Sequence, residues 1–236
     1  MIKVIFLDID DTLLSFSGYV KKAMENGFSE FGLPSYDASM YPVFCQINNQ
    51  LWRQIELGTL TYEELLKIRW NLIFRALHIS FDGELFETYF RESLFTSAIP
   101  MPHARELLEY LSPRYLLCAA SNGPYEQQYN RLRIGGMEGY FSHFFISSQI
   151  GAQKPDTAFF DHCFRILRET GLPDLQPEEA LIIGDSLTSD IAGGKAYGLK
   201  TCLYMPAPLA DMECPDADLL VSDLLELTHL LNGKGE

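Results

Sequence analysis

Positive charge is scarce in this 236-residue chain, in which 18 Lys and Arg residues stand against 32 Asp and Glu residues, giving a formal net charge of −14. Binding to a nucleic acid polymer or to an anionic membrane requires surfaces rich in Lys and Arg, so neither is expected as a partner. A small anionic molecule is compatible with this charge, because one pocket of an acidic protein can be locally positive.

Cysteine pairs and long apolar runs are also missing. The five cysteines form no Cys-x-x-Cys pair, which argues against a disulfide framework and a zinc knuckle; they are Cys45, Cys118, Cys163, Cys202 and Cys214. No apolar run reaches ~18 residues, and the N-terminus turns acidic at Asp8, too early for a signal peptide. The five histidines show no metal-ligand spacing. These absences predict a cytoplasmic protein without a membrane anchor.

Apolar residues are plentiful, at 47% of the chain, and their spacing predicts the elements. Residues 3–7 form a short apolar run, typical of a buried parallel strand. From about residue 19 to 95 the apolar residues recur every three or four positions, which predicts about four helices. One of these helices opens with Thr61-Tyr62-Glu63-Glu64, which has the form of a capping box.

Beyond Pro102, helices and strands alternate. We expect strands near 115–120, 144–147, 180–183, 200–204 and 219–221, with helices between them, one of which covers residues 189–197. This order predicts a Rossmann-like, doubly wound parallel sheet of the α/β class. The predicted domains are a core of residues 1–16 and 97–236 and an inserted all-helical domain of residues 17–96.

Polar groups follow four of the predicted strands. Because ligands of an open α/β sheet bind at the carboxyl ends of its strands, these groups should meet at one edge. They are Asp8-Ile9-Asp10-Asp11-Thr12, Ser121-Asn122-Gly123-Pro124, Gln153-Lys154-Pro155, and Gly184-Asp185 followed by Asp190.

The chemistry of this set favours phosphoryl transfer. Carboxylates of residues 8, 10 and 185 would repel one another at one edge unless a cation lay between them, and hard oxygen ligands suit Mg²⁺. Lys154 and the backbone N–H groups after Ser121 would supply positive charge for a phosphoryl group. Pro124 at the first helical position would direct a helix N-terminus towards the same anion.

Together these motifs resemble those of the haloacid-dehalogenase (HAD) superfamily. In order, Asp8-x-Asp10-x-Thr12, Ser121, Lys154-Pro155 and Gly184-Asp185-x₄-Asp190 match its four motifs, and the helical insertion resembles its type 1 cap. More narrowly, the segment Ile47-Asn48-Asn49-Gln50-Leu51-Trp52 and the sequences around Ser121 and Asp185 resemble the 5′-nucleotidase branch that acts on pyrimidine and noncanonical nucleotides. Ser121 stands where this branch often has Thr, which keeps the hydroxyl.

The resemblance implies a role for each motif residue. Asp8 would be the nucleophile that forms an aspartyl-phosphate, and Asp10 the general acid and base. Mg²⁺ would be held by Asp8, Asp185 and the backbone carbonyl of Asp10. Ser121, Asn122 and Lys154 would bind the phosphoryl oxygens, and Asp190 would orient Lys154 or metal-bound water. The substrate would be a small phosphorylated metabolite, taken by a monomer or a homodimer.

Other activities of the same fold remain open. A sugar-phosphate phosphatase, a phosphomutase or a 2-haloacid dehalogenase would share most of these motifs, although a dehalogenase needs neither the metal nor Asp10. A phospho-accepting signalling domain would have no use for the helical insertion. Substrate choice should lie in the predicted cap, where Phe16, Trp52 and Phe95 are candidates to stack on a base and Arg53 could meet a polar edge of the substrate.

Overall fold

The computed structural model describes residues 1–206 and 216–232, so Cys214 lies outside the described residues. The chain divides into two compact units. The core unit comprises Met1–Ser15 and Ala98–Glu236, and the helical unit comprises Phe16–Ser97. The divisions predicted from the sequence fall after residues 16 and 96, one residue away from those of the structure at each end. That the helical unit acts as a cap stays a prediction.

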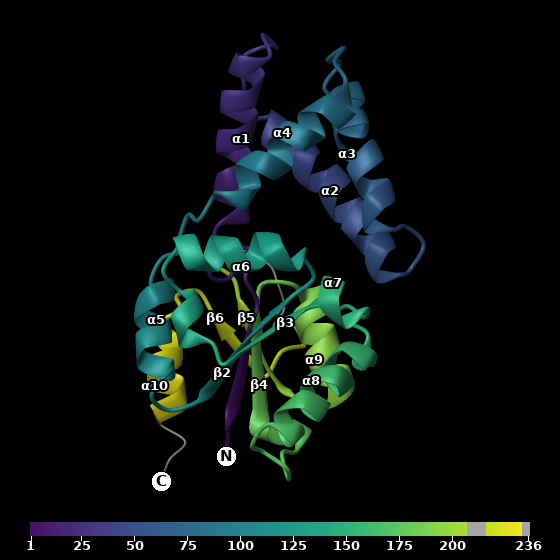
Figure 1. Ribbon diagram of the computed structural model, residues 1–236. Coiled ribbons are helices and arrows are strands. Elements are labelled where there is room, and N and C mark those ends of the chain that lie inside the picture. The colour runs from purple at the N-terminus through teal and green to yellow at the C-terminus, as the bar shows by residue number, and fades with distance from the viewer. Residues whose placement is uncertain (207–215, 233–236) are drawn as a thin grey trace. The chain divides into compact units, whose positions relative to one another are not determined.

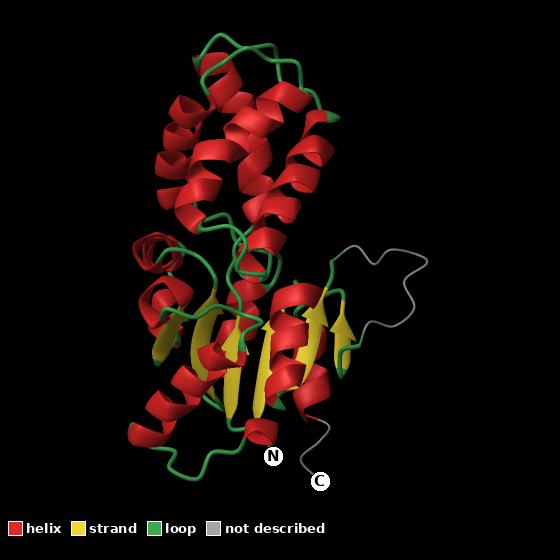
Figure 2. Ribbon diagram, turned by 90° about the vertical axis from the view of Figure 1, so that its right-hand side faces the viewer, coloured by secondary structure: helices red, strands yellow, loops and turns green. Residues whose placement is uncertain are grey.

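The core unit is built on a six-stranded sheet in which every neighbouring pair is parallel, in the order β3-β2-β1-β4-β5-β6 (Figures 1 and 2). This confirms the predicted doubly wound α/β class. Its strands are β1 (Val4–Leu7), β2 (Leu116–Ser121), β3 (His143–Ile146), β4 (Ala180–Gly184), β5 (Lys200–Tyr204) and β6 (Leu219–Val221).

Helices cover both faces of this sheet, and strand β1 shows why. Successive side chains of a strand point to opposite faces, so a strand covered on both sides is apolar at every position. Val4 and Phe6 pack towards α8 (Thr157–Glu169) and α9 (Ala192–Tyr197). Ile5 and Leu7 pack on the other face, where the covering helices are α5 (Ala104–Leu111), α6 (Tyr125–Ile134) and α10 (Glu226–Asn232).

Two of the predicted helix starts differ from the structure. Pro124 is the N-cap of α6 and keeps an extended backbone (ψ 135°), whereas we expected it inside the helix. The helix predicted over residues 189–197 begins as a π-helical turn, Leu187–Ile191, and becomes α-helical only in α9. A one-turn helix, α7 (Ser147–Ile150), also follows β3. Turns of this length leave too little periodicity in a sequence to be recognised.

The helical unit consists of α1 (Phe16–Glu30), α2 (Met40–Glu56), α3 (Tyr62–Ala76) and α4 (Gly83–Phe95). The predicted capping box at the start of α3 is confirmed. The Glu64 N–H donates to Thr61 Oγ1 at 3.2 Å, and the Thr61 N–H donates to Glu64 Oε2 at 2.8 Å. Each bond satisfies an amide that has no partner within the helix.

Aromatic rings form the interior of the helical unit. Trp70 is fully buried, and its ring centroid lies 4.4 Å from that of Phe86 and 5.3 Å from that of Phe90. Phe16, a candidate base-stacking residue, packs against Phe44 and Phe90 within this cluster. Phe16 and Trp52 are both half-buried, the latter beside Tyr62, whereas Phe95 is exposed.

One ion pair is buried inside the helical unit. Arg69 on α3 donates two parallel hydrogen bonds to Glu87 on α4, from Nε to Oε2 at 3.0 Å and from Nη2 to Oε1 at 2.5 Å. Its remaining guanidinium nitrogen, Nη1, donates to Asn48 Oδ1 at 3.1 Å. A two-bond geometry of this kind is the strongest form of an arginine–carboxylate contact.

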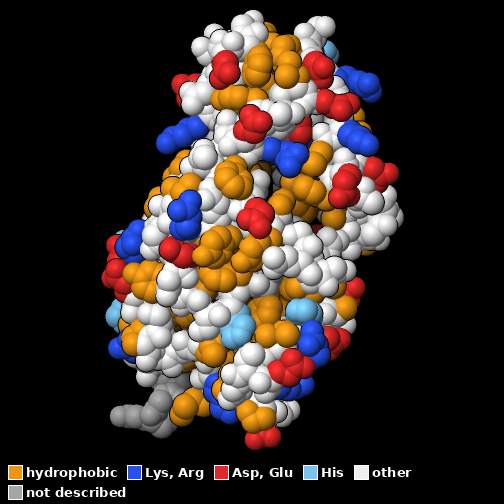
Figure 3. Space-filling model, viewed as in Figure 1, with side chains coloured by type: hydrophobic (Ala, Val, Ile, Leu, Met, Phe, Trp, Pro, Cys, Tyr) orange, Lys and Arg blue, Asp and Glu red, His pale blue; other side chains and the backbone are white. Residues whose placement is uncertain are grey.

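The structure also bears on the charge, the apolar runs and the cysteines considered in the sequence. On the face drawn in Figure 3, acidic and basic side chains are interspersed among apolar ones. Among the described residues, no helix combines the length and the apolar character needed to cross a bilayer. The described cysteines, Cys45, Cys118, Cys163 and Cys202, are all free thiols.

Candidate active site

Three adjacent strands deliver the predicted site residues to one edge of the sheet. Asp8 follows β1, Ser121 ends β2, and Asp185 follows Gly184, the last residue of β4. The register pairs Leu7 with Ala119 on one side and with Ile183 on the other, so these strand ends are level. The Asp8 N–H donates to the Ile183 carbonyl at 2.9 Å, which fixes the start of the loop after β1 against β4.

Lys154 is the positive charge of this edge. Its side chain is 1% exposed, and its Nζ donates to Asp8 Oδ1 at 2.8 Å, to Asp190 Oδ1 at 2.5 Å and to the Ala120 carbonyl at 2.6 Å. An ammonium group has three protons, so all of its donors are used. The group is therefore held in one position by three elements.

Asn122 fixes the backbone of Lys154. Its Nδ2 donates to the Lys154 carbonyl at 2.8 Å, and its Oδ1 accepts from the Lys154 N–H at 2.9 Å. The predicted part of Asn122 was its backbone N–H, as a donor to a phosphoryl oxygen. The structure adds a side chain that joins the loop after β2 to the loop that carries Lys154.

The acidic residues outnumber the cation that they face. Burial, with the charge of Asp190 in addition, raises the pKa of Asp8 to about 8 against the opposing effect of Lys154. Burial and then the charges of Asp8 and Asp190 raise the pKa of Asp185 well above its usual range, although part of its side chain is accessible. Burial disfavours the Lys154 ammonium, but Asp190 and Asp8 outweigh this effect and raise its pKa. One ammonium thus does not neutralise the three carboxylates.

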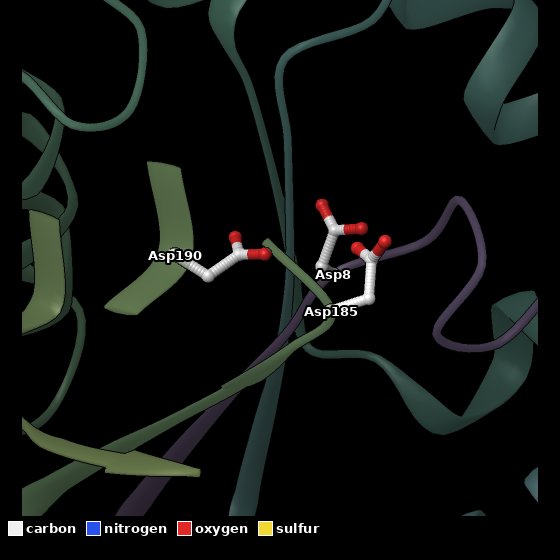
Figure 4. Close-up of side chains that lie close together, drawn as sticks. All are labelled: Asp8, Asp185 and Asp190. Atoms are coloured by element: carbon white, nitrogen blue, oxygen red, sulfur yellow. The ribbon is translucent and has the colours of Figure 1, made fainter. Parts of the chain in front are cut away.

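Asp8, Asp185 and Asp190 lie close enough to hold a cation, because one carboxylate oxygen of each lies within 4.8 Å of the others. Figure 4 shows the carboxylates of Asp8 and Asp185 next to each other, with Asp190 reaching in from the π-helical turn. Hard carboxylate oxygens with excess negative charge fit Mg²⁺. Among the described residues, no other group of three or more His, Cys, Asp or Glu side chains brings its ligand atoms this close together.

Asp190 differs from the other two members because both of its oxygens have partners. Oδ1 accepts from Lys154, and Oδ2 accepts from the Ser186 N–H at 3.1 Å. Asp190 also lies directly against β4, since a Cβ atom on Gly184 would fall 2.2 Å from Asp190 Oδ2. Only glycine fits at position 184. This geometry suits Asp190 for orienting Lys154 and leaves Asp8 and Asp185 as the better cation ligands.

The loop after β1 carries Asp10 through a tight turn. The N–H groups of Leu13 and Leu14 both donate to the Ile9 carbonyl at 2.9 Å, and Asp11 takes a left-handed backbone with φ 53°. Ile9, Leu13 and Leu14 are fully buried and anchor the turn in the core. Asp11 is thus a turn residue.

The side chain of Asp10 does not join the other carboxylates but faces helix α6. Arg131 Nη1 donates to Asp10 Oδ1 at 2.5 Å, and Gln128 Nε2 donates to Asp10 Oδ2 at 2.7 Å. Neither residue was predicted from the sequence. Their spacing of three places positions 128 and 131 on the same side of α6, but it does not indicate that this side faces the sheet edge.

Ser121 is connected to the same glutamine. Its Oγ accepts from Gln128 Nε2 at 2.9 Å and from the Gly123 N–H at 3.3 Å. A hydroxyl has two lone pairs and one proton, so two accepted bonds leave the proton to be donated. Ser121 is 3% exposed. Its hydroxyl could donate this remaining proton to a bound anion.

The comparisons with known proteins show the family of this chain. The haloacid dehalogenase-like hydrolase family model matches residues 2–198, so the chain belongs to this family and is an enzyme of the hydrolase class. A crystal structure of the HAD-hydrolase YfnB from Bacillus subtilis, bound to magnesium, superposes with a TM-score of 0.86 at 31% identity, covering 98% of this chain and 99% of that chain.

Two curated relatives carry more specific names. The pyrimidine 5′-nucleotidase PynA of Streptococcus pneumoniae is 32% identical over 205 residues, which are 86% of this chain and 84% of that protein. A glyceraldehyde 3-phosphate phosphatase of Pyrococcus furiosus is 26% identical over 240 residues, 98% of this chain and 93% of that protein. The names of these two relatives describe phosphatases with different substrates, a nucleotide in one and a triose phosphate in the other.

Proposed function

We propose that this hydrolase is a Mg²⁺-dependent phosphatase of small phosphomonoesters, with nucleoside 5′-monophosphates as its substrates and the cytoplasm as its location. The observation that carries the proposal is the junction at Lys154, whose ammonium group holds both Asp8 and Asp190 next to the carboxylate of Asp185. A nucleophilic carboxylate, a fixed cation and a site for a divalent ion are what phosphoryl transfer requires.

In the first step, a carboxylate oxygen of Asp8 attacks phosphorus in line with the ester oxygen. A bond forms from Asp8 to phosphorus, the bond from phosphorus to the ester oxygen breaks, and Asp10 gives a proton to the departing alcohol. The positive charge of Lys154, fixed beside Asp8, offsets the charge of the phosphoryl oxygens, and the Ser121 hydroxyl donates to one of them. In the second step Asp10 takes a proton from water, whose oxygen attacks phosphorus and releases Asp8 and inorganic phosphate.

Mg²⁺ would be held by the carboxylates of Asp8 and Asp185 and by the Asp10 carbonyl, where it would offset the negative charge that the phosphoryl group brings to three carboxylates. Asp190 keeps Lys154 charged and in place during both steps, because its Oδ1 lies 2.5 Å from the ammonium nitrogen. Asn122 serves the same end through the Lys154 backbone.

Phosphate release from uridine and cytidine 5′-monophosphates tests the chemistry. We expect turnover with Mg²⁺, none in EDTA, and a loss of at least about 10⁴-fold in Asp8→Asn, because the nucleophile is removed while its shape is kept. Asp174→Asn, an exposed acidic residue of the same unit, is the matched control and should turn over normally. Turnover in EDTA, or an active Asp8→Asn enzyme, contradicts the mechanism.

The substrate class needs a second comparison. PynA supports a pyrimidine nucleotide, while the relative from Pyrococcus furiosus supports a triose phosphate as the second candidate. We expect kcat/KM for uridine 5′-monophosphate to exceed that for glyceraldehyde 3-phosphate. The reverse order would leave the mechanism intact but assign the enzyme to sugar phosphates. Release of free phosphate separates either phosphatase from a mutase, which would return the group to a bound sugar.

A further inference from the structure

Helix α6 holds the carboxylate of Asp10 at both of its oxygens. Oδ1 accepts from Arg131 Nη1 at 2.5 Å, and Oδ2 accepts from Gln128 Nε2 at 2.7 Å. The two clamp residues are also bonded to each other, because Arg131 Nη1 donates to Gln128 Oε1 at 2.8 Å. This closed arrangement fixes the orientation of the glutamine amide, since a flipped amide would turn its oxygen towards the carboxylate and its N–H groups towards the guanidinium.

Both clamp residues are completely buried. Gln128 and Arg131 are 0% exposed, although they lie on a helix whose inner face could have been filled with leucine. Burying a guanidinium is unfavourable unless it is paired, and an apolar replacement of a buried polar group is often neutral or stabilising. Packing alone therefore gives no reason for this pair. The placement of the Asp10 carboxylate does.

Gly123 leaves the space that the clamp occupies. A Cβ atom at position 123 would lie 2.7 Å from Gln128 Nε2 and 3.0 Å from Gln128 Cδ. The glycine therefore permits the glutamine to reach between the loop after β2 and the loop after β1. In that place the Gln128 amide uses one N–H on Asp10 and the other on Ser121 Oγ.

We propose that Gln128 and Arg131 are positioning residues that hold Asp10 for proton transfer, and that Gln128 also sets the Ser121 hydroxyl for the phosphoryl group. This inference rests on the proposed function, in which Asp10 is the acid and base. A carboxylate offers about four acceptor positions, so two bonds leave one on each oxygen for the transferred proton. Arg131 bonds Asp10 directly and reaches Ser121 only through Gln128, whereas Gln128 bonds both Asp10 and Ser121.

The choice of leaving group separates this role from a structural one. A nucleoside leaves as an alkoxide unless it receives a proton, whereas p-nitrophenolate leaves as a stable anion. In Arg131→Met and Gln128→Leu we expect the aspartyl-phosphate to form about 10- to 100-fold more slowly from uridine 5′-monophosphate. With p-nitrophenyl phosphate the first step should keep its rate. The slow second step should then appear as a burst of one nitrophenolate per enzyme.

The two variants should also differ from each other. Arg131→Met should lower kcat and raise KM less than Gln128→Leu does, because Arg131 bonds Asp10 directly but reaches Ser121 only through the glutamine. Gln128→Leu should lower kcat and also raise KM, because the Ser121 hydroxyl loses one of its two donors and keeps only the Gly123 N–H. Arg133→Met is the matched control, since Arg133 lies on the same helix, is exposed, and donates to Asn130. It should behave as the wild type in both assays.

Three results decide the matter. Equal losses with both phosphate esters, and no burst, would show a structural role and overturn the proposal, as would wild-type kinetics in both variants. If urea denaturation shows that Arg131→Met is unfolded, Gln128→Leu and Arg131→Lys replace it in the test. Arg131→Lys should then recover part of kcat. A wild-type enzyme that releases no phosphate from any ester would instead refute the proposed function, so the two failures are distinguishable.

Discussion

The two units bury charge in opposite ways. In the helical unit Arg69 and Glu87 are matched one to one, with Asn48 taking the remaining guanidinium nitrogen. In the core unit a single ammonium faces the carboxylates of Asp8, Asp185 and Asp190. The first arrangement is complete within the protein, whereas the second has an excess of negative charge that a cation must offset.

This contrast helps to distinguish buried charges that stabilise the fold from buried charges that bind a ligand. A balanced pair without accessible oxygens connects two helices and needs nothing further. Burial raises the pKa of Glu87 as well as those of Asp8 and Asp185, but only in the unbalanced cluster do neighbouring carboxylates add to the rise, which favours the binding of a cation. The sites to test are then the ones whose charges do not cancel.

Breaking the balanced pair should have the largest effect on stability. Arg69→Leu leaves the Glu87 carboxylate buried without its counterion, which should lower the free energy of unfolding by about 3–5 kcal/mol. Urea denaturation followed by circular dichroism measures this change. Arg53→Leu removes an exposed partner of Glu56 in the same unit and should cost less than about 1 kcal/mol. Equal losses in the two variants would contradict the comparison.

In the unbalanced cluster, removing a charge should raise the free energy of unfolding instead of lowering it. Burial raises the folded-state pKa of Asp8 from 3.8 to about 8, so its contribution to stability is fully present below the lower value and is lost as the pH rises through the higher one. In EDTA, Asp8→Asn should therefore gain stability relative to the wild type as the pH is raised from 5 to about 8.5.

Thermal denaturation at both pH values measures this gain, and Asp174→Asn should show none. Added Mg²⁺ should stabilise the wild type at the higher pH more than Asp8→Asn, since it binds the folded cluster. A difference between wild type and Asp8→Asn that is the same at both pH values would show that Asp8 is not held with a raised pKa.

The smallest effect should come from the capping box of α3. Thr61→Ala removes the side-chain oxygen that accepts from the Glu64 N–H, which should cost about 1 kcal/mol of unfolding free energy. Urea denaturation compares it with Thr88→Ala, an exposed position inside α4 that should change stability by less than about 0.5 kcal/mol. Phosphate release should stay unchanged in both variants, which separates local helix stability from the site.

Much of the site could be predicted because its residues follow strands. Buried parallel strands are short apolar runs, and the polar residue after each run marks the sheet edge, so the order of residues along the chain was enough to place Asp8, Ser121 and Asp185 there. Gln128 and Arg131 could not be placed in this way. Polar residues on a helix usually face solvent, and no sequence pattern says that this helix turns them inward.

The order of the elements, the parallel sheet and the family follow from the amino-acid sequence alone, because apolar spacing and the motifs next to the strands are enough to indicate them. Which groups meet depends on the folded chain: Lys154 holds both Asp8 and Asp190, and Asp10 is turned towards α6. The physical reason is that spacing along the chain fixes local conformation, whereas contacts between distant side chains depend on how the helices pack against the sheet.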